Sequence, residues 1–166
     1  PANCYGDSKV QAENGLRELA EEGFKVVILR PPMIYGKGSK GNYPILSKFA
    51  QKFPLFPYIK NERSMLYIEN FCEFVRLMIE NEEEGIFWPQ NKEYSNTSEM
   101  VKMIAAIHGK KVRLIKGMGW LLKIMSCFTG LVNKAFGNLT YEKSLSMYKN
   151  KYQLFSPKES IQRIED

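Results

Sequence analysis

The chain has 166 residues, of which 44% are hydrophobic and 25% are charged, and its formal net charge is +6. This length and composition predict a globular protein with a core of ordinary size, and they exclude a disordered chain. The positive charge would suit nucleic acid, but the lysines are spread along the chain and the aromatic residues do not interleave with them. We therefore expect no nucleic-acid partner.

Cysteine and histidine are scarce, which excludes several kinds of site. Cys4, Cys72 and Cys127 show no metal-ligand spacing, and His108 is the only histidine. The pattern predicts a reduced, cytoplasmic protein without a bound metal. Because His108 precedes Gly109 at an expected helix end, a capping or exposed position suits it better than catalysis.

The stretch 117–136 approaches membrane-spanning length. Lys123, Lys134 and internal glycines interrupt it, so we expect two short amphipathic helices here. Their lysines could flank an apolar face at a membrane surface. We nevertheless do not expect a membrane surface as a partner.

The first predicted elements are a helix and a strand. Apolar residues at helical spacing predict a helix over 5–22, with Gly23 at the position of its C-cap. The following residues, KVVILR at 25–30, form a nearly continuous apolar run, which is typical of a parallel strand buried on both faces. Pro31 and Pro32 end this strand, because proline cannot donate to the hydrogen-bond ladder.

Helices and strands continue to alternate along the rest of the chain. The remaining expected elements are a helix over 45–52, a Pro-rich connection at 54–57, a strand over 63–68, a helix opened by Asn70 and Glu73, a strand over 85–88, a helix opened by Asn96 and Glu99 and ended by Gly109, a strand over 111–115, and a last helix with Ser156, Pro157 and Glu159 at its start. This alternation predicts an α/β fold with a mixed, less regular C-terminal half.

Residues 36–41 spell G-x-G-x-x-G, the glycine pattern of dinucleotide-binding loops. That fingerprint needs a strand, a glycine turn and a helix in immediate succession. Two prolines and residues 33–35 are expected to separate the strand from the glycines, and no second β-unit is expected to follow. We therefore interpret 36–41 as a loop that could line a substrate crevice, and not as a dinucleotide site.

Tyr5 and Lys9 form the candidate catalytic pair. On a helix, residues at i and i+4 lie one above the other on the same face. An ammonium group a few ångströms from a phenol favours the ionised phenol, which suits a general base that removes a proton from a hydroxyl group. About one such pair is expected by chance in a chain of this composition, so its context decides its meaning.

Three strings in a fixed order provide that context: YGDSKVQAE, then KVVILRPPMIYGKG, then RSMLYIEN. Together they resemble the extended short-chain dehydrogenase/reductase family, especially its nucleotide-sugar epimerases and dehydratases of the UDP-glucose 4-epimerase type. The resemblance covers residues 1–115 and fades afterwards. It implies an α/β fold that contains part of a Rossmann-type doubly wound sheet.

The family's chemistry implies an NAD-dependent enzyme that oxidises a sugar carbon and leaves a keto-sugar. An epimerase returns the hydride to the other face of the sugar, whereas a dehydratase uses the keto group to change neighbouring bonds. We expect an epimerase. A dehydratase or reductase of the same fold, and a non-catalytic module that binds a nucleotide sugar or a partner chain, are the alternatives.

The resemblance implies catalytic and cofactor roles for four residues. Tyr5 would be the acid/base, and Lys9 would tune it and hold the ribose of NAD, so that both also contact the cofactor. Pro31 and Pro32 would present main chain near the nicotinamide.

Two further residues are implied in binding the substrate, a nucleotide-diphosphate sugar. Arg63 would bind the pyrophosphate, because a guanidinium group meets such oxygens in a planar fork, although it could equally pair with a carboxylate. Asn42 is the second candidate, although asparagine is also common in turns. Met33 stands where relatives often have an asparagine that contacts substrate, so one polar contact is missing.

The resemblance also divides the chain. Residues 1–36 would be the last Rossmann elements, and residues 37–166 would be mainly a smaller, mixed α/β substrate-binding lobe, with a Rossmann strand and helix interleaved near 63–81. The glycine-rich turn for the cofactor pyrophosphate, and a Ser or Thr that assists the tyrosine, would precede Pro1. We therefore expect the C-terminal portion of a longer enzyme, inactive alone, and by analogy with the family a homodimer.

Overall fold

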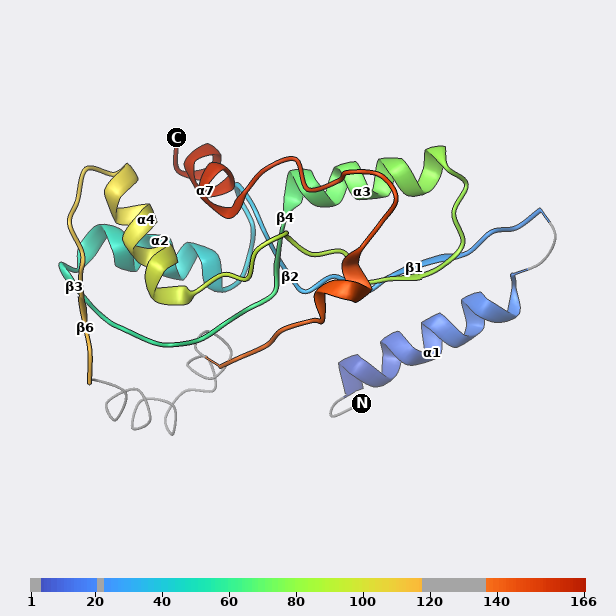
Figure 1. Ribbon diagram of the computed structural model, residues 1–166. Coiled ribbons are helices and arrows are strands. Elements are labelled where there is room, and N and C mark those ends of the chain that lie inside the picture. Colours follow the sequence, from blue (N-terminus) through green and yellow to red (C-terminus); the bar gives the residue numbers. More distant parts are fainter. Residues whose placement is uncertain (1–3, 21–22, 118–136) are drawn as a thin grey trace.

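The computed structural model describes residues 4–20, 23–117 and 137–166 (Figure 1). The expected amphipathic helices at 117–136 lie, apart from Gly117, outside the described residues. The elements are α1 (Cys4–Glu18), β1 (Val27–Leu29), β2 (Met33–Tyr35), α2 (Asn42–Lys52), β3 (Leu55–Pro57), β4 (Met65–Tyr67), α3 (Ile68–Glu80), β5 (Gly85–Phe87), α4 (Thr97–Ile107), β6 (Arg113–Ile115), the 3-10 helix η1 (Lys143–Ser146) and α7 (Pro157–Glu165).

The strands form three parallel pairs, β1 with β5, β2 with β4, and β3 with β6. Parallel strands joined through helices are what an α/β fold requires, and the predicted class is confirmed. Strands β2 and β3 were not expected from the sequence. Each has three residues and stands next to prolines, so neither shows a hydrophobic period long enough to recognise.

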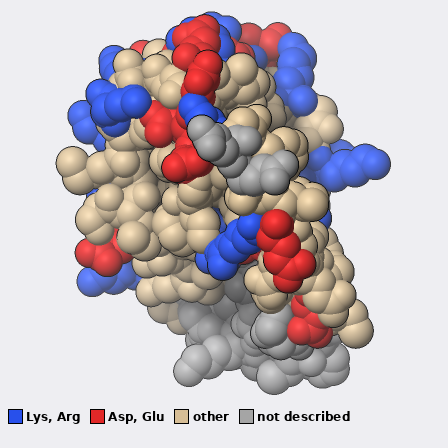
Figure 2. All heavy atoms as spheres, turned by 90° about the vertical axis from the view of Figure 1, so that its right-hand side faces the viewer, with Lys and Arg blue, Asp and Glu red and all other residues tan. Residues whose placement is uncertain are grey.

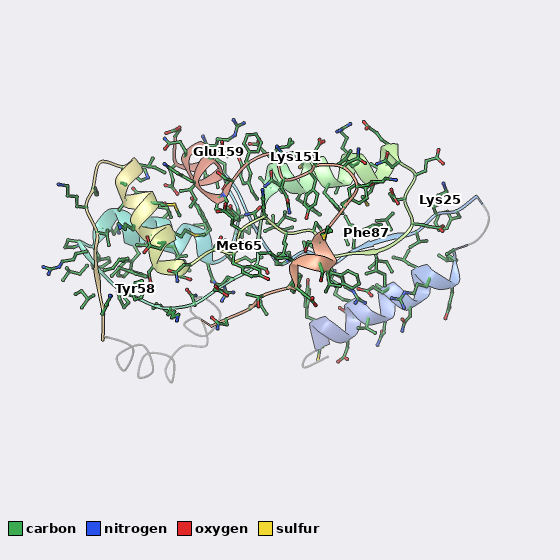
Figure 3. All side chains as sticks on the ribbon, in the orientation of Figure 1. Lys25, Tyr58, Met65, Phe87, Lys151 and Glu159 are labelled. Carbon is green, nitrogen blue, oxygen red and sulfur yellow. The ribbon has the colours of Figure 1, made fainter. Side chains whose placement is uncertain are left out.

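The helices α2, α4 and α7 enclose the larger of two hydrophobic clusters. Tyr35 of β2, Ile104 of α4 and Ile161 of α7 are completely buried in it. A second cluster lies beneath α3 and contains Leu66 and Phe74. The labelled side chain of Met65, on β4, lies near the middle of the molecule in Figure 3, between these two regions.

The region around α1 and β1 is packed much less. Helix α1 lies on the opposite side of β1 from α3 in Figure 1, and none of its residues is buried. The prediction of a strand buried on both faces is wrong for this chain, because Ile28 is the one buried residue of β1. Val27 and Leu29 instead line an open groove of about 630 Å³ beside α3.

Two of the three predicted helix N-caps are correct. The Asn96 side chain accepts hydrogen bonds from the backbone N–H groups of Ser98 and Glu99 at the start of α4. Helix α7 begins with a reciprocal capping box between Ser156 and Glu159. Both arrangements satisfy backbone donors that have no partner within the helix.

The predicted start of α3 is wrong. The helix begins at Ile68, and Asn70 lies inside its first turn, where it is buried. Its side chain does not cap the helix, because it donates to Asn91 Oδ1 at 3.1 Å and to the carbonyl oxygen of Phe155 at 2.9 Å. Glu73 bonds to Arg76 instead of to the helix start.

The boundaries of the first two helices also differ from expectation. Helix α1 ends at Glu18, before the predicted end at residue 22. Gly23, with φ of 91°, is therefore not adjacent to the end of the helix. Helix α2 begins at Asn42 and not at residue 45, with Gly41 as its N-cap at φ 118°. Glycine adopts this conformation without the strain that a Cβ atom would bring.

The helix α2 start changes the reading of the glycine loop. Strand β2 ends at Tyr35, the glycines follow at once, and α2 begins directly after Gly41. Strand β4, which pairs with β2 in parallel, comes next in that sheet. The sequence-based argument that no strand directly precedes the glycines is therefore wrong, because β2 was not recognised. The interpretation that the loop is not a dinucleotide site stays a prediction.

Charges of both signs are interspersed over the surface. On the face shown in Figure 2, Lys and Arg side chains alternate with Asp and Glu side chains.

None of the helices in the described residues has both the length and the hydrophobicity that a membrane span needs. The free thiols of Cys4 and Cys72 are exposed.

Candidate substrate pocket and catalytic helix

Arg63 is held in place by its backbone. Its N–H donates to the Ser95 carbonyl oxygen at 3.0 Å, and the Ser95 N–H donates back to the Arg63 carbonyl oxygen at 2.9 Å. These bonds form an isolated antiparallel bridge just before β4, and a second bridge joins Arg63 to Leu139. The chain is therefore fixed on both sides of Arg63, which fixes where its side chain begins.

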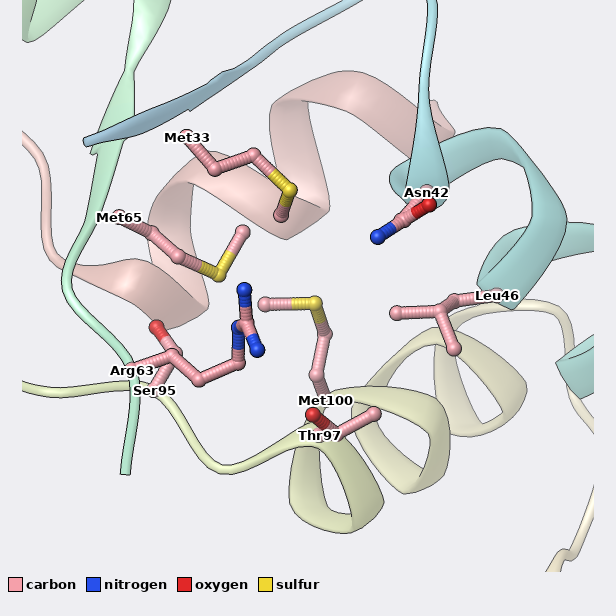
Figure 4. A pocket seen from close by; sticks show the side chains of 8 residues that line it. All are labelled: Met33, Asn42, Leu46, Arg63, Met65, Ser95, Thr97 and Met100. Atoms are coloured by element: carbon pink, nitrogen blue, oxygen red, sulfur yellow. The ribbon is translucent and has the colours of Figure 1, made fainter. Parts of the chain in front are cut away.

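The Arg63 side chain enters a small cavity of about 10 Å³ between β2, β4, α2 and α4 (Figure 4). In Figure 4 the guanidinium group points into the space between three methionine side chains, and Asn42 points toward the same space from the start of α2. The lining residues are Met33, Asn42, Leu46, Arg63, Met65, Ser95, Thr97 and Met100. The structure thus brings the two predicted substrate residues, which are distant in sequence, into one pocket.

The electrostatic setting of Arg63 is unusual for a cation. The residue is only 7% exposed, and burial lowers the pKa of its guanidinium group. Its NH1 group donates to the carbonyl oxygen of Gly137 at 2.7 Å. Within the described residues no carboxylate pairs with it. A buried positive charge without a counter-charge favours binding of an anion, which would neutralise it.

A network of buried side chains fixes the strands that form the pocket. Asn91 accepts from the Tyr67 N–H at 3.1 Å and donates to the Tyr35 hydroxyl at 3.0 Å, which lies 2.6 Å from Ser160 Oγ. These bonds connect β2, β4 and α7. Because buried polar groups are costly to leave without partners, the network holds the three elements in one arrangement.

A second part of this network ties down the C-terminal segment. The Ser64 hydroxyl donates to Gln90 Oε1, and Gln90 Nε2 lies 2.6 Å from the hydroxyl oxygen of Ser146, in η1. The Tyr152 hydroxyl donates to the Gln90 carbonyl oxygen at 3.0 Å. Ser64 directly follows Arg63, so this network also positions the pocket arginine.

The candidate catalytic pair lies apart from this pocket, on the exposed helix α1. Tyr5 is 71% exposed, and the Lys9 ammonium group lies 5.4 Å from the centroid of its ring. The predicted placement of the two side chains on one face of a helix is therefore confirmed. A hydrogen-bonded ion pair between Glu13 and Arg30 connects α1 to the residue that follows β1.

Pro31 and Pro32 form the link between β1 and β2, where Pro32 is buried and Pro31 half-buried. His108 ends α4, and its Nε2 atom lies 2.7 Å from Glu165 of α7. The histidine thus serves the packing of α7 on α4. Among the described residues, no group of three or more His, Cys, Asp or Glu side chains is arranged to hold a metal ion.

Several pocket residues were not recognised in the sequence. Ser95 and Thr97 flank the correctly predicted cap Asn96, and Met65 and Met100 were assigned only to a strand and a helix. The sequence gives no indication that position 95 pairs with position 63. Met33, noted as a departure from the family pattern, does line the pocket.

The parallel strand pairs and the helices around them define a Rossmann-type α/β protein. The solved structure of UDP-N-acetylglucosamine 4-epimerase from Bacillus cereus matches with a TM-score of 0.70 at 14% identity, over 99% of this chain and 56% of that chain. At this identity the likeness establishes the fold alone. The prediction of part of a doubly wound sheet with a mixed α/β lobe is confirmed.

The sequence comparisons establish the family. Residues 1–88, more than half of the chain, match the NAD dependent epimerase/dehydratase family. The chain belongs to this family, and the resemblance to extended short-chain dehydrogenases/reductases is confirmed.

Two curated proteins show how far the similarity extends. The chain is 28% identical over 153 residues to UDP-glucose 4-epimerase of Vibrio cholerae, covering 87% of this chain and 47% of that protein. It is 32% identical over 144 residues to N-acetyl-alpha-D-glucosaminyl-diphospho-ditrans,octacis-undecaprenol 4-epimerase of Escherichia coli O157:H7, covering 78% and 44%. The chain thus spans slightly less than half the length of these relatives.

Proposed function

We propose that this chain is the substrate-binding portion, with the catalytic helix, of an NAD-dependent epimerase that acts on a sugar linked to a diphosphate. The observation that supports this most strongly is the buried Arg63 guanidinium, which faces a cavity and has no carboxylate partner among the described residues. Two diphosphate-linked sugars are named by the epimerases that the chain resembles.

In this proposal Arg63 binds the diphosphate, and Asn42 contributes an amide donor from the start of α2. A guanidinium group can bind two phosphoryl oxygens at once, which fixes the orientation of the ligand. The backbone N–H groups at the start of α2 add favourable positive potential on the same side. The flexible methionine side chains around Arg63 can move to admit the ligand.

Tyr5 would act as the acid/base of the reaction. In its ionised form the exposed Tyr5 side chain would accept the proton of a sugar hydroxyl and become a neutral phenol, and the neighbouring Lys9 ammonium would favour the ionised form beforehand. Both groups are accessible for a cofactor ribose, as the family requires, and Pro31 and Pro32 would present main chain toward the nicotinamide. Bound NAD would supply the acceptor for the hydride. Homodimer formation and a cytoplasmic location stay predictions.

A nucleotide sugar is our first choice of substrate, and a polyprenyl-diphosphate sugar is the second. The second candidate is favoured by the relative from Escherichia coli O157:H7, whose name specifies an undecaprenol diphosphate and whose identity to this chain is 32%. Arg63 would serve both, because the diphosphate is common to them.

Calorimetry with UDP and UDP-N-acetylglucosamine tests the proposal on the protein expressed at its full natural length. We expect binding that Arg63→Gln weakens about tenfold to a hundredfold, the range for a hydrogen bond to a charged group. Arg113→Gln is the matched control, because Arg113 is exposed on β6 and the substitution removes the same charge. Equal weakening by both variants would contradict a specific role for Arg63.

A turnover assay tests whether this chain is catalytically inactive by itself. The 166-residue chain alone, incubated with NAD and UDP-sugars, should show no epimerisation, because we predict that the loop 36–41 is not the family's glycine-rich turn for the cofactor pyrophosphate. Robust turnover by this chain would show that it needs nothing further.

A further inference from the structure

Ser95 shares the pocket with Arg63 for a geometric reason. The two residues face each other in an antiparallel bridge in which each N–H donates to the other's carbonyl oxygen. Directly opposed residues in such a pair project their side chains to the same face, with Cβ atoms about 5 Å apart. The two side chains therefore begin next to each other, and both residues line the same cavity.

The Ser95 hydroxyl is buried without a partner. The residue is 6% exposed, and no hydrogen bond reaches its Oγ atom from any residue that the structure describes. Its backbone groups are both used in the bridge with Arg63. A buried hydroxyl without a partner is costly, and such groups in folded proteins usually have a function or bind a water molecule or ion.

The surroundings of this hydroxyl favour an anionic ligand. The cavity is about 10 Å³, the smallest size that holds one water molecule, and its walls include three methionine side chains. Its other polar groups are the Arg63 cation, the Asn42 amide and the Thr97 hydroxyl. A phosphoryl oxygen bound by the guanidinium group would be within reach of the neighbouring hydroxyl, which can donate one hydrogen bond.

We propose that Ser95 is a substrate-binding residue whose hydroxyl donates a hydrogen bond to a phosphoryl oxygen of the diphosphate that Arg63 binds. This inference rests on the proposed function, because it takes the diphosphate as the ligand. The substrate site then has two side-chain groups on one bridge: a cation that attracts the diphosphate and a neutral donor that fixes one of its oxygens.

The test compares wild-type protein at its full natural length with Ser95→Ala, by calorimetry with UDP and separately with geranyl diphosphate. These two probes share the diphosphate and differ in what carries it. We expect Ser95→Ala to weaken each interaction that the wild type shows by about tenfold or more, because the lost bond is to a charged group. The probe that binds more tightly to the wild type identifies the carrier.

Thermal unfolding without ligand provides a second readout. Ser95→Ala should unfold at the same temperature as the wild type or higher, because it removes a buried group without a partner. Ser98→Ala is the matched control: the Ser98 hydroxyl donates to Pro57 and accepts from the Ile59 N–H, so its loss should lower the unfolding temperature and leave affinity unchanged. Ser95→Cys, of similar size, should weaken binding in the same direction as Ser95→Ala.

The outcomes separate the two proposals. If the wild type binds UDP or geranyl diphosphate and Ser95→Ala binds it equally well, the role of Ser95 is overturned and the proposed function stands. A pocket that holds only a water molecule would give this result. If the wild type binds neither probe, both proposals are overturned.

Discussion

The two sides of this molecule differ in how completely they are packed. The pocket side is formed by β2, β4, α2, α4 and α7. It contains completely buried side chains, such as Tyr35, Ile104 and Ile161, and a connected polar network. On the other side, α1 carries the candidate catalytic pair and has no buried residue, and β1 borders an open groove. The candidate substrate pocket is therefore enclosed by packed elements, whereas the candidate catalytic helix is exposed.

Because of this difference, the side chains of the two candidate sites are held by different numbers of contacts. Arg63 is fixed by backbone bridges, a side-chain hydrogen bond and a buried network. Tyr5 and Lys9 contact each other, and the ion pair between Glu13 and Arg30 joins their helix to the residue after β1. The proposal therefore predicts that further groups are needed to complete a catalytic site at α1; the chain spans slightly less than half the length of the two curated relatives.

The largest expected difference between the two sides is in stability. Ile104→Ala removes a completely buried side chain from the core beside the pocket and should lower the free energy of unfolding of the chain by about 2–5 kcal/mol. Leu16→Ala, on α1, removes a side chain that is 44% exposed and should change it by less than about 0.5 kcal/mol. Urea denaturation measures both, and similar losses would show that α1 is packed as firmly as α4.

A smaller effect should come from the polar network. Asn91→Ala removes the acceptor of the Tyr67 N–H and of the Asn70 side chain, and we expect a loss of about 3 kcal/mol, since each buried donor left unpaired costs about 1–3 kcal/mol. The exposed Asn150 offers a control, because Asn150→Ala should have little effect. Equal effects of the two substitutions in denaturant titrations would mean that the network does not hold the pocket together.

The smallest expected effect is on the dependence of stability on pH. Hydrogen bonds from Ser156 lower the pKa of Glu159 below 4.5, and the hydrogen bond from Arg30 does the same for Glu13. A lowered pKa stabilises the fold above about pH 4.5, and this contribution is lost as pH falls through the folded-state value. Urea midpoints should therefore be level from pH 7 to about 5 and fall in more acidic solution.

The two sides should respond differently to removal of these carboxylates. Glu159→Gln should flatten the acid dependence more than Glu13→Gln, because α7 is packed on the core and α1 is not. The reverse order would indicate that α1 is part of the cooperative unit that unfolds with the pocket.

Much of the fold followed from local chemistry in the sequence. The caps at Asn96 and Ser156 and the Tyr5–Lys9 spacing depend on residues within one helical turn, and all three are found as expected. The parallel strand class followed from alternation of apolar runs with helical patterns. The placement of Asn42 and Arg63 in one pocket was implied by resemblance to the family, and not by spacing.

The features that were missed depend on contacts between distant residues. Asn70 looks like a helix cap in sequence, but its amide is used by Asn91 and Phe155. The pairing of Ser95 with Arg63 has no local pattern. Strand β2 is three residues long and was obscured by the prolines before it, which also led to the wrong argument about the glycine loop. Such choices are made by tertiary packing and not by the local sequence.

The most direct test of the account compares Tyr5→Phe with Arg63→Gln in the protein at its full natural length, by measuring kcat with its diphosphate-linked sugar and Kd for UDP. We predict that Tyr5→Phe lowers kcat by about a hundredfold or more and leaves Kd nearly unchanged, because general acid–base catalysis contributes about 10²–10⁴-fold. Arg63→Gln should mainly raise Kd. If Tyr5→Phe weakened UDP binding as much as Arg63→Gln, the separation into a binding pocket and a catalytic helix would be contradicted.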